Sequence, residues 1–461
     1  MNSQSKKMEL LGSASIPKAL LAMGIPTMIG MLVNAFYNLV DAYFVGGLGE
    51  SQMGAISVVY PLGQVVVGLG LLFGNGATSY ISRLLGRGDN ENADKAASTA
   101  LYSSISVGAV IIIISMIFLH PILKLLGATD SILPYAATYA GIYIVSCIFN
   151  VFNVTMNNIV TSEGAAKTTM CALLTGAALN IALDPLFIYV FDLGVAGAAI
   201  ATAISQVVST CVYLTYILRK KSVFHFRVKD CTYSKEIMSE IFKIGIPTLV
   251  FQILTSLSIS LINNAAGNYS DSAIAGMGVV TRLISMGSLS VFGFIKGFQP
   301  IAGYSYGAKK FDRLREAIKT SILWSTVFCV IFGLILALFP AAIVSQFTKG
   351  DTEMIRIGAA SLRANGITIM LFGFYTVYSS LFLALGKGKE GFILGACRQG
   401  ICFIPVILLL PMVWGLNGIL YTQPIADVLS AIITVFMAIP LHKKLNEMQR
   451  QVTVINTDEK N

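Results

Sequence analysis

The chain has 461 residues, of which 55% are hydrophobic and only 12% are charged. Soluble globular proteins carry about 25% charged residues, so this chain has too few to cover the surface of a water-soluble protein of its size. Together with a mean hydropathy of +0.75, this argues against a soluble enzyme, a disordered chain and a nucleic-acid-binding protein. The composition predicts an all-α polytopic membrane protein.

A helix needs about 20 apolar residues to cross a bilayer, and twelve apolar runs of sufficient length follow one another along the chain. The first 15 residues are polar and lead into an apolar run too long for a signal peptide, so we expect no cleaved leader. The twelve predicted spans lie at about 16–45, 52–78, 97–120, 132–160, 168–190, 194–217, 237–265, 272–299, 316–340, 353–384, 390–413 and 416–440.

The basic residues predict the orientation of these spans. Of the 32 Lys and Arg residues, 25 lie in the termini and in the loops on the same side of the membrane as the termini, and only three lie in the opposite loops. Cytoplasmic loops carry an excess of Lys and Arg. We therefore expect both termini in the cytoplasm of a bacterial-type plasma (inner) membrane, and the net charge of +9 is mostly a topology signal.

The sequence repeats itself with an offset of 221 residues. Gly24-Ile25-Pro26 recurs as Gly245-Ile246-Pro247, and Gly86 in the basic loop after the second span matches Gly307 in the loop after the eighth. Six spans in each half give both halves the same orientation, which is a common plan of secondary transporters. We therefore expect two six-helix bundles with a cavity between them. The predicted divisions are an N-terminal bundle at 1–218, a basic cytoplasmic linker at 219–236, a C-terminal bundle at 237–445 and a polar cytoplasmic tail at 446–461.

Charged groups inside a bilayer are costly and mark candidate functional sites. Asp41 lies in the first span with Tyr37 one turn before it, and Asp184 lies in the fifth span with Asn180 one turn before it. Thr202 in the sixth span lies at a similar depth, about one to two turns from the outer surface. These oxygen-bearing side chains suit a proton or a hard cation, and two neighbouring carboxylates favour loading a proton. We predict an ion-coupling site of Asp41, Asp184, Asn180, Thr202 and Tyr37; the first four would be the metal ligands only if Na⁺ is the coupling ion.

Other polar residues inside the spans are candidates for the lining of the substrate cavity. Asn153 and Asn157 recur at helical spacing in the fourth span, where they either line the cavity or join helices. Gln206 follows Thr202 by one turn, Gln252 lies in the seventh span, and Arg282 in the eighth either faces the cavity or pairs with an acceptor. The abundant Met and aromatic residues suit a pocket for varied flat or cationic molecules.

The remaining charges within the spans have open roles. Arg398 and Asp427 lie within about a turn of one another in depth, and a structural ion pair is the favoured interpretation. Lys296 lies near the cytoplasmic end of its span and is a candidate for snorkelling, while Arg363 either faces the cavity or finds an acceptor. We expect no cofactor beyond the coupling ion, H⁺ or Na⁺, and no obligate protein partner.

Three sequence segments resemble a known family. They are Asn38-Leu-Val-Asp-Ala-Tyr-Phe-Val-Gly46, Tyr80-Ile-Ser-Arg-Leu-Leu-Gly86, and Leu179-Asn-Ile-Ala-Leu-Asp-Pro185 with the glycine-rich run from Gly194 to Thr202. The chain resembles the MATE (multidrug and toxic compound extrusion) transporters, in the DinF branch near the MepA-like exporters. The resemblance covers nearly the whole chain.

This resemblance implies a V-shaped pair of six-helix bundles that exports organic, often cationic, amphipathic drugs in exchange for H⁺ or Na⁺. It also implies that Asp41, Asp184, Asn180, Thr202 and Tyr37 form the coupling site of the N-terminal bundle. The NorM-like branch carries an acidic site in the other bundle; here the seventh span has Gln252 and no carboxylate between Lys243 and Asp271.

Three alternative functions compete with this one. A flippase for lipid-linked oligosaccharides or polysaccharides, from the related flippase superfamily, would need a strongly cationic cavity, and the four bases inside the spans leave that open. A major-facilitator transporter lacks support, because its characteristic loop pattern is missing after the second span. An intramembrane aspartyl protease would use the Gly-x-Gly-Asp pattern at 86–89, but that pattern lies in a hydrophilic loop, and we predict no enzyme. The sequence has no GxxxxGK[ST] phosphate loop for ATP hydrolysis.

Overall fold

The computed structural model describes residues 3–348 and 350–458, and these residues form an all-helical bundle. Twelve helical segments in the described chain are long and apolar enough to span a bilayer, as predicted. Lys349 and Lys460, which enter the count of basic residues, lie outside the described residues. The N-terminal half contains α1 (Ser3–Gly12), α2 (Ile16–Gly46), α3 (Glu50–Arg87), α4 (Asn90–Ile117), α5 (Leu119–Leu125), α6 (Leu133–Ser162), α7 (Ala166–Pro185), the π-helical turn η1 (Leu186–Val190) and α8 (Gly194–Leu218).

The C-terminal half repeats the order from α2 onward, with more breaks within its helices, after a connection that contains only one 3₁₀ turn, η2 (Val228–Asp230). Its last helix continues without a break to Asp458, so much of the segment predicted as a polar tail is helical. Its elements are α9 (Lys235–Gly267), α10 (Asp271–Gly307), α11 (Phe311–Leu338), α12 (Pro340–Ser345), α13 (Thr352–Thr368), η3 (Ile369–Leu371), α14 (Phe372–Ala384), α15 (Gly388–Ala396), η4 (Cys397–Ile401), α16 (Phe403–Trp414) and α17 (Leu416–Asp458).

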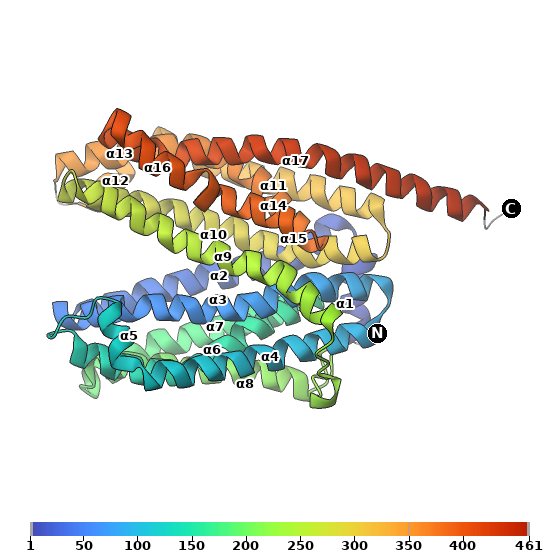
Figure 1. The fold of residues 1–461 in the computed structure, drawn as a ribbon, viewed down its shortest axis with the longest axis horizontal. Coiled ribbons are helices and arrows are strands. Elements are labelled where there is room, and N and C mark those ends of the chain that lie inside the picture. The colour runs from blue at the N-terminus through green and yellow to red at the C-terminus, as the bar shows by residue number, and fades with distance from the viewer. Residues whose placement is uncertain (1–2, 349, 459–461) are drawn as a thin grey trace.

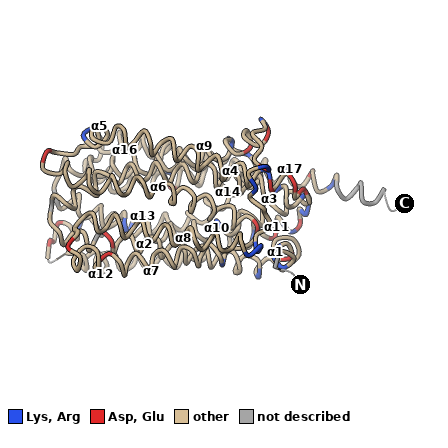
Figure 2. The backbone as a smooth tube through the Cα atoms, turned by 90° about the horizontal axis from the view of Figure 1, so that it is seen from below, with Lys and Arg blue, Asp and Glu red and all other residues tan. Residues whose placement is uncertain are grey.

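The two halves form two bundles, or lobes, that lie side by side (Figure 1). Both chain ends lie at one end of the molecule, which we call the terminal side; the opposite end is the far side. Lys and Arg gather strongly on the terminal side (Figure 2), which is the asymmetry that the sequence predicts. The second span, predicted at 52–78, runs on to Arg87 because its polar extension packs against the other lobe: Arg83 pairs with Glu240 of α9 at 2.5 Å.

The lobes meet closely on the terminal side, and the contacts obey the 221-residue offset. A Cβ atom at Gly86 would lie 2.1 Å from the carbonyl oxygen of Tyr304, and one at Gly307 would lie 2.1 Å from that of Arg83. Residues 83 and 304 are themselves repeat equivalents. The same contact is therefore made twice, as expected of two similar units related by a two-fold axis, and only glycine fits at either position.

Towards the far side the lobes separate. The Thr27 hydroxyl donates across the lobes to the carbonyl of Gly293 at 2.6 Å, yet Met286, about two turns earlier on the same face of α10, is 58% exposed. Likewise Gln252 donates to Gln64 of α3 at 3.1 Å, yet Tyr60, one turn from Gln64, is 61% exposed. The faces that seal the terminal side are therefore open nearer the far side.

Candidate functional site

Asp184 and Asn180 form a buried polar pair near the far-side end of α7. The Asn180 amide donates to Asp184 Oδ1 at 3.2 Å, and Asp184 is 0% exposed. The one-turn spacing that the sequence suggested therefore brings the two side chains into contact. The α-helix gives way to the π-helical turn η1 directly after Pro185, so the acid lies where the regular helix ends.

Asp41 of α2 approaches Asp184 from the neighbouring helix. Helices α2 and α7 pack against one another, and the two carboxyl groups lie close enough to interact electrostatically. Two ionised carboxylates cannot donate a hydrogen bond to each other, and they repel strongly in a medium of low dielectric constant. Burial of the pair is therefore less costly when a proton or another cation neutralises part of its charge.

Three buried oxygen atoms of this pair of helices accept no hydrogen bond within the described chain: Asp41 Oδ1, Asp184 Oδ2 and Asn180 Oδ1. Buried polar atoms are normally satisfied, so three together call for an explanation. Carboxylate and amide oxygens are the ligand types of hard cations, and they equally accept a proton. These residues therefore fit a proton or a hard cation. Among the described residues, no group of three or more His, Cys, Asp or Glu side chains could hold a metal ion, so a cation here would also need amide or hydroxyl oxygens.

Two tyrosines, Tyr37 and Tyr139, lie near the acid pair. Tyr37 interacts electrostatically with both carboxyl groups, as its one-turn spacing from Asp41 suggested. Tyr139 of α6, which sequence reasoning missed, is buried, interacts with Asp41 and Asp184, and stacks on Tyr143 with ring centroids 5.6 Å apart. The signal that could have identified Tyr139 is its own one-turn spacing from Tyr143, which places two phenols on one face of α6.

Thr202 lies on α8 at the depth of Asp184. Helices α7 and α8 run antiparallel; Gly176 packs against Ser209, and Gly197 packs against Phe187. This register brings the segment around residue 201 opposite Asp184. The Thr202 hydroxyl is partly buried, and within residues 3–348 and 350–458 it makes no hydrogen bond to the acid pair. Its predicted role in the coupling site stays a prediction.

Asn153 and Gln206 join two helices. The Asn153 amide donates to the carbonyl oxygen and to Oε1 of Gln206, at 2.9 and 2.8 Å, and Asn153 Oδ1 accepts from Thr210 at 3.0 Å. These bonds tie α6 to α8, which is the helix-joining alternative that the sequence left open for Asn153. Their predicted role in lining a substrate cavity stays a prediction.

Asn157 connects the two lobes. Its amide donates to the Tyr213 hydroxyl at 3.3 Å, and its oxygen accepts from the ammonium group of the partly buried Lys296 in α10. Lys296 was expected to snorkel; instead it reaches across the lobe boundary.

The other two cavity candidates lie on lobe-facing surfaces. Gln252 contacts Gln64 of the opposite lobe, as described above. Arg282 is exposed and lies about three turns before Gly293 on the same face of α10, so it faces the N-terminal lobe across the open part of the boundary. Arg363 is also exposed, on α13.

The predicted pair of Arg398 and Asp427 is present in the C-terminal lobe. Arg398 Nε donates to Asp427 Oδ1 at 3.0 Å, and the same oxygen accepts from Gln423 at 2.9 Å and from Tyr375 at 3.2 Å. The guanidinium also lies 4.6 Å from the ring centroid of Phe372. This acid therefore has a fixed counter-charge and two further donors.

The MatE family model matches this chain twice, at residues 26–186 and 247–409. The two matches begin at Pro26 and Pro247, which are the repeat equivalents recognised from the sequence. Between them, the matches cover the cores of both lobes.

Curated relatives and solved structures agree with this match. Multidrug export protein MepA of Staphylococcus aureus strain MSSA476 is 31% identical over 429 residues, covering 93% of this chain and 94% of that protein. The protein of the same name from Staphylococcus saprophyticus is 30% identical, with 94% and 95% covered. A structure described as the outward-facing conformation of a multidrug resistance MATE family transporter of the MOP superfamily matches with a TM-score of 0.90 at 26% identity, covering 96% of this chain and 99% of that one. A MOP superfamily transporter from Pyrococcus furiosus, described as having a binding pocket of reverse polarity, matches with a TM-score of 0.89 at 26% identity and the same coverage.

Proposed function

Because the chain belongs to the MATE family of membrane transporters, we propose that it exports organic, often cationic, compounds in antiport with H⁺ or Na⁺. The observation that carries this proposal is the set of three buried oxygen atoms that lack a donor, on Asp41, Asp184 and Asn180 of two helices that pack together. Such a cluster can bind a small cation, and because it has no fixed positive partner it can also release that cation. A protein that only let substrate move down its own gradient would not need such an ion-binding cluster.

The proposed exchange follows from electrostatics. With a proton or Na⁺ between them, the two carboxyl groups are partly neutralised and tolerate burial; without it, they repel and favour an arrangement with better solvation. The bound ion therefore favours one arrangement of the N-terminal lobe over the other. A ligand shifts such an equilibrium only by its difference in affinity for the two states, and the unsatisfied oxygens supply that difference.

Alternating access would be a rocking of the two lobes. In the present arrangement the terminal side is closed by backbone contacts at Gly86 and Gly307, and the faces nearer the far side are exposed. Rocking would break those contacts together with the bond from Lys296 to Asn157. The gathering of Lys and Arg on the terminal side (Figure 2) supports a cytoplasmic location of that side. The present state would then be outward-facing, in a bacterial plasma membrane.

The test is ion-driven transport in proteoliposomes. Wild-type protein, Asp41→Asn and Asp184→Asn are compared for uptake of a fluorescent organic cation under an imposed pH gradient and, separately, an imposed Na⁺ gradient. We expect each substitution to lower gradient-driven transport at least about tenfold, because an amide neither takes up a proton nor carries a negative charge that attracts a cation. The gradient that drives the wild-type protein identifies the ion.

The matched control is Asp130→Asn, which removes an exposed acid on the far side. It should transport like wild type. Full gradient-driven transport by both Asp41→Asn and Asp184→Asn would refute the coupling site, and loss of transport in the control would show that the assay reports net charge instead.

A further inference from the structure

A hollow of about 250 Å³ lies on the terminal side, between the first turns of α7 and the last turns of α8. We call it the α7–α8 basic pocket. It lies in the N-terminal lobe, at the terminal-side ends of two spans. The acid pair is well away from it, near the opposite end of α7. The pocket is lined by Lys167, Thr168, Cys171, Val212, Thr215, Tyr216, Arg219 and Lys221.

The charge of this pocket is entirely positive. Lys167, Arg219 and Lys221 are all exposed, and none of them forms an ion pair with any described acid. The lining contains no Asp or Glu. Lys and Arg groups that converge without a counter-charge are suited to a phosphate.

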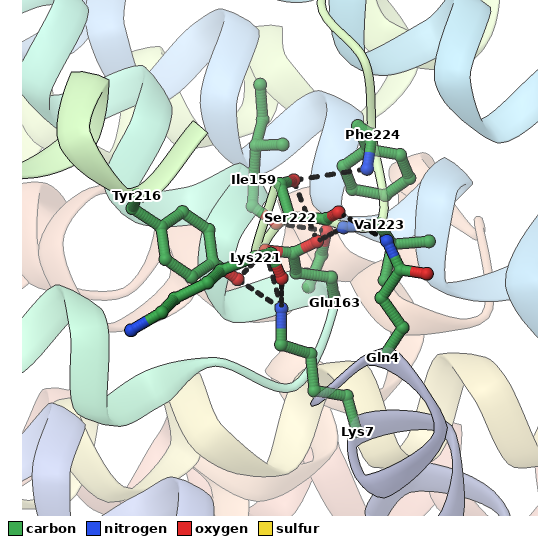
Figure 3. A network of polar contacts seen from close by, with 10 residues as sticks. Gln4, Lys7, Ile159, Glu163, Tyr216, Lys221, Ser222, Val223 and Phe224 are labelled. Carbon is green, nitrogen blue, oxygen red and sulfur yellow. Dashed lines mark hydrogen bonds and ion pairs between the residues drawn. The ribbon is translucent and has the colours of Figure 1, made fainter. Parts of the chain in front are cut away.

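The nearest buried acid does not oppose an anion here, because its partners already surround it. Glu163, which is 0% exposed, accepts from the Ser222 hydroxyl at 3.0 Å, from the Val223 amide at 2.6 Å and from the Tyr216 hydroxyl, and it pairs with Lys7 at 3.4 Å. Figure 3 shows these groups converging on Glu163, while the ammonium group of Lys221 points away from it.

The same network fixes the back wall of the pocket. Lys7 Nζ donates to the backbone carbonyl of Lys221 at 2.5 Å, and Gln4 donates to that of Ser222 at 2.8 Å, so α1 holds the start of the connection between the lobes (Figure 3). The Tyr216 ring and the Lys221 backbone are thus held in place before any ligand arrives. A site built in advance costs less to order when it binds.

The pocket is amphipathic along the membrane normal. Its bases lie at the ends of the helices, whereas Cys171 and Val212 lie about 6 Å and 10 Å further into the membrane, at 1.5 Å per residue from Lys167 and Arg219. Leu214 and Leu218, exposed on the same stretch of α8, extend the apolar surface beside it. Basic groups at the membrane surface next to apolar side chains deeper in the membrane suit a lipid, with its charged headgroup and acyl chains, better than a free anion.

We propose that the α7–α8 basic pocket binds the phosphate headgroup of an anionic phospholipid, with an acyl chain along the apolar surface of α8. Basic pockets between spanning helices at a membrane interface are suited to such headgroups. The bound phosphate bridges α7, α8 and the start of the connection between the lobes.

The test measures lipid binding to the full-length protein in neutral detergent. Phosphatidylglycerol or phosphatidylcholine is titrated, and bound lipid is counted by native mass spectrometry. Each base near a membrane surface contributes about fivefold in affinity. We therefore expect the triple variant K167Q/R219Q/K221Q to bind the tightest phosphatidylglycerol molecule with about 100-fold lower affinity. Its affinity for phosphatidylcholine should not change.

The matched control is K220Q/R227Q/K229Q, which removes three exposed bases from the same segment but outside the pocket. It should keep the tight lipid. Equal losses in the two triple variants would overturn the proposal, because binding would then follow the net charge of the terminal side. Both variants are first checked for a wild-type thermal midpoint in phosphatidylcholine.

Two further readouts locate the site and identify the source of the phosphate. Phosphatidylglycerol should slow alkylation of the exposed Cys171 thiol in the lining more than that of Cys211, which is exposed outside it, and only in protein that keeps the three bases. Equal protection of both thiols would overturn the site. Inorganic phosphate and glycerol phosphate should give no protection at equal concentration; full protection by either would overturn the lipid assignment.

Discussion

The two lobes share one architecture but treat their buried acids in opposite ways. In the C-terminal lobe, Asp427 Oδ1 accepts from Arg398, Gln423 and Tyr375. In the N-terminal lobe, Asp184 receives one bond, from Asn180, and its other oxygen receives none from the described residues.

The difference teaches what an exchangeable ion site requires. An acid with a permanent counter-charge is already neutralised, so an arriving cation gains little there. An acid pair without one must take its positive charge from outside, and it can give that charge back. The repeat therefore supplied two similar scaffolds, of which one is built for stability and the other has the features of an ion site.

The largest effect on stability is expected in the C-terminal lobe. Asp427→Asn leaves the Arg398 guanidinium buried without an acid, and breaking a buried ion pair costs about 3–5 kcal/mol. The measurement is the free energy of unfolding in detergent. The double variant Asp427→Leu/Arg398→Met should recover most of the loss, because replacing both partners by apolar groups is often neutral. If Asp427→Asn alone were as stable as wild type, Asp427 would not be a structural acid and the contrast between the two lobes would fail.

An intermediate effect is expected at Glu163, which lies on the terminal side between two spans. Burial raises the pKa of Glu163, and the charge of Lys7 opposes that rise; burial also lowers the pKa of Lys7 itself. Lys7→Met removes one charged partner but leaves the donors Tyr216, Ser222 and Val223, so we expect a loss of about 2 kcal/mol.

The pH dependence of this loss has a definite sign. Without Lys7 the folded-state pKa of Glu163 rises further above its unfolded value. A raised carboxyl pKa gives stability that is complete below the unfolded value and is lost as the pH rises through the folded one. Thermal midpoints of Lys7→Met should therefore fall further below wild type at pH 8 than at pH 5. The exposed neighbour Lys6 supplies the control, Lys6→Met; a larger loss at pH 5 would contradict the assignment.

The smallest effect on stability is expected at the acid pair itself. Asp184→Asn keeps the shape of the side chain and its bond from Asn180, and it removes a charge whose burial is costly. The free energy of unfolding should change by less than about 1 kcal/mol or increase, although ion-driven transport is lost. A loss as large as that of Asp427→Asn would show that Asp184 is a structural residue like Asp427.

Much of this contrast could be read from the sequence, because helical spacing sets which side chains share a face. The neighbouring placements of Asn180 and Asp184, and of Arg398 and Asp427, follow from periodicity and depth alone. The repeat of Gly86 at Gly307 also marked equivalent positions before any contact was known.

Contacts that depend on the rotation of one helix against another could not be predicted in this way. Tyr139 approaches Asp41 from a different helix, and Lys296 reaches Asn157 across the lobe boundary. The partners of Glu163 come from α1, α8 and the connection between the lobes, three segments far apart in the chain. No spacing rule links such residues, because the packing of whole helices decides where they meet.

The glycine contacts on the terminal side have a consequence for leakage. An antiporter that is driven by an ion gradient must not provide a continuous water-filled path for that ion through the bilayer. At Gly86 and Gly307 backbone meets backbone so closely that even a Cβ atom would not fit between the lobes. Under the antiport proposed above, this seam would keep the driving ion from leaking across the membrane while the faces nearer the far side are exposed.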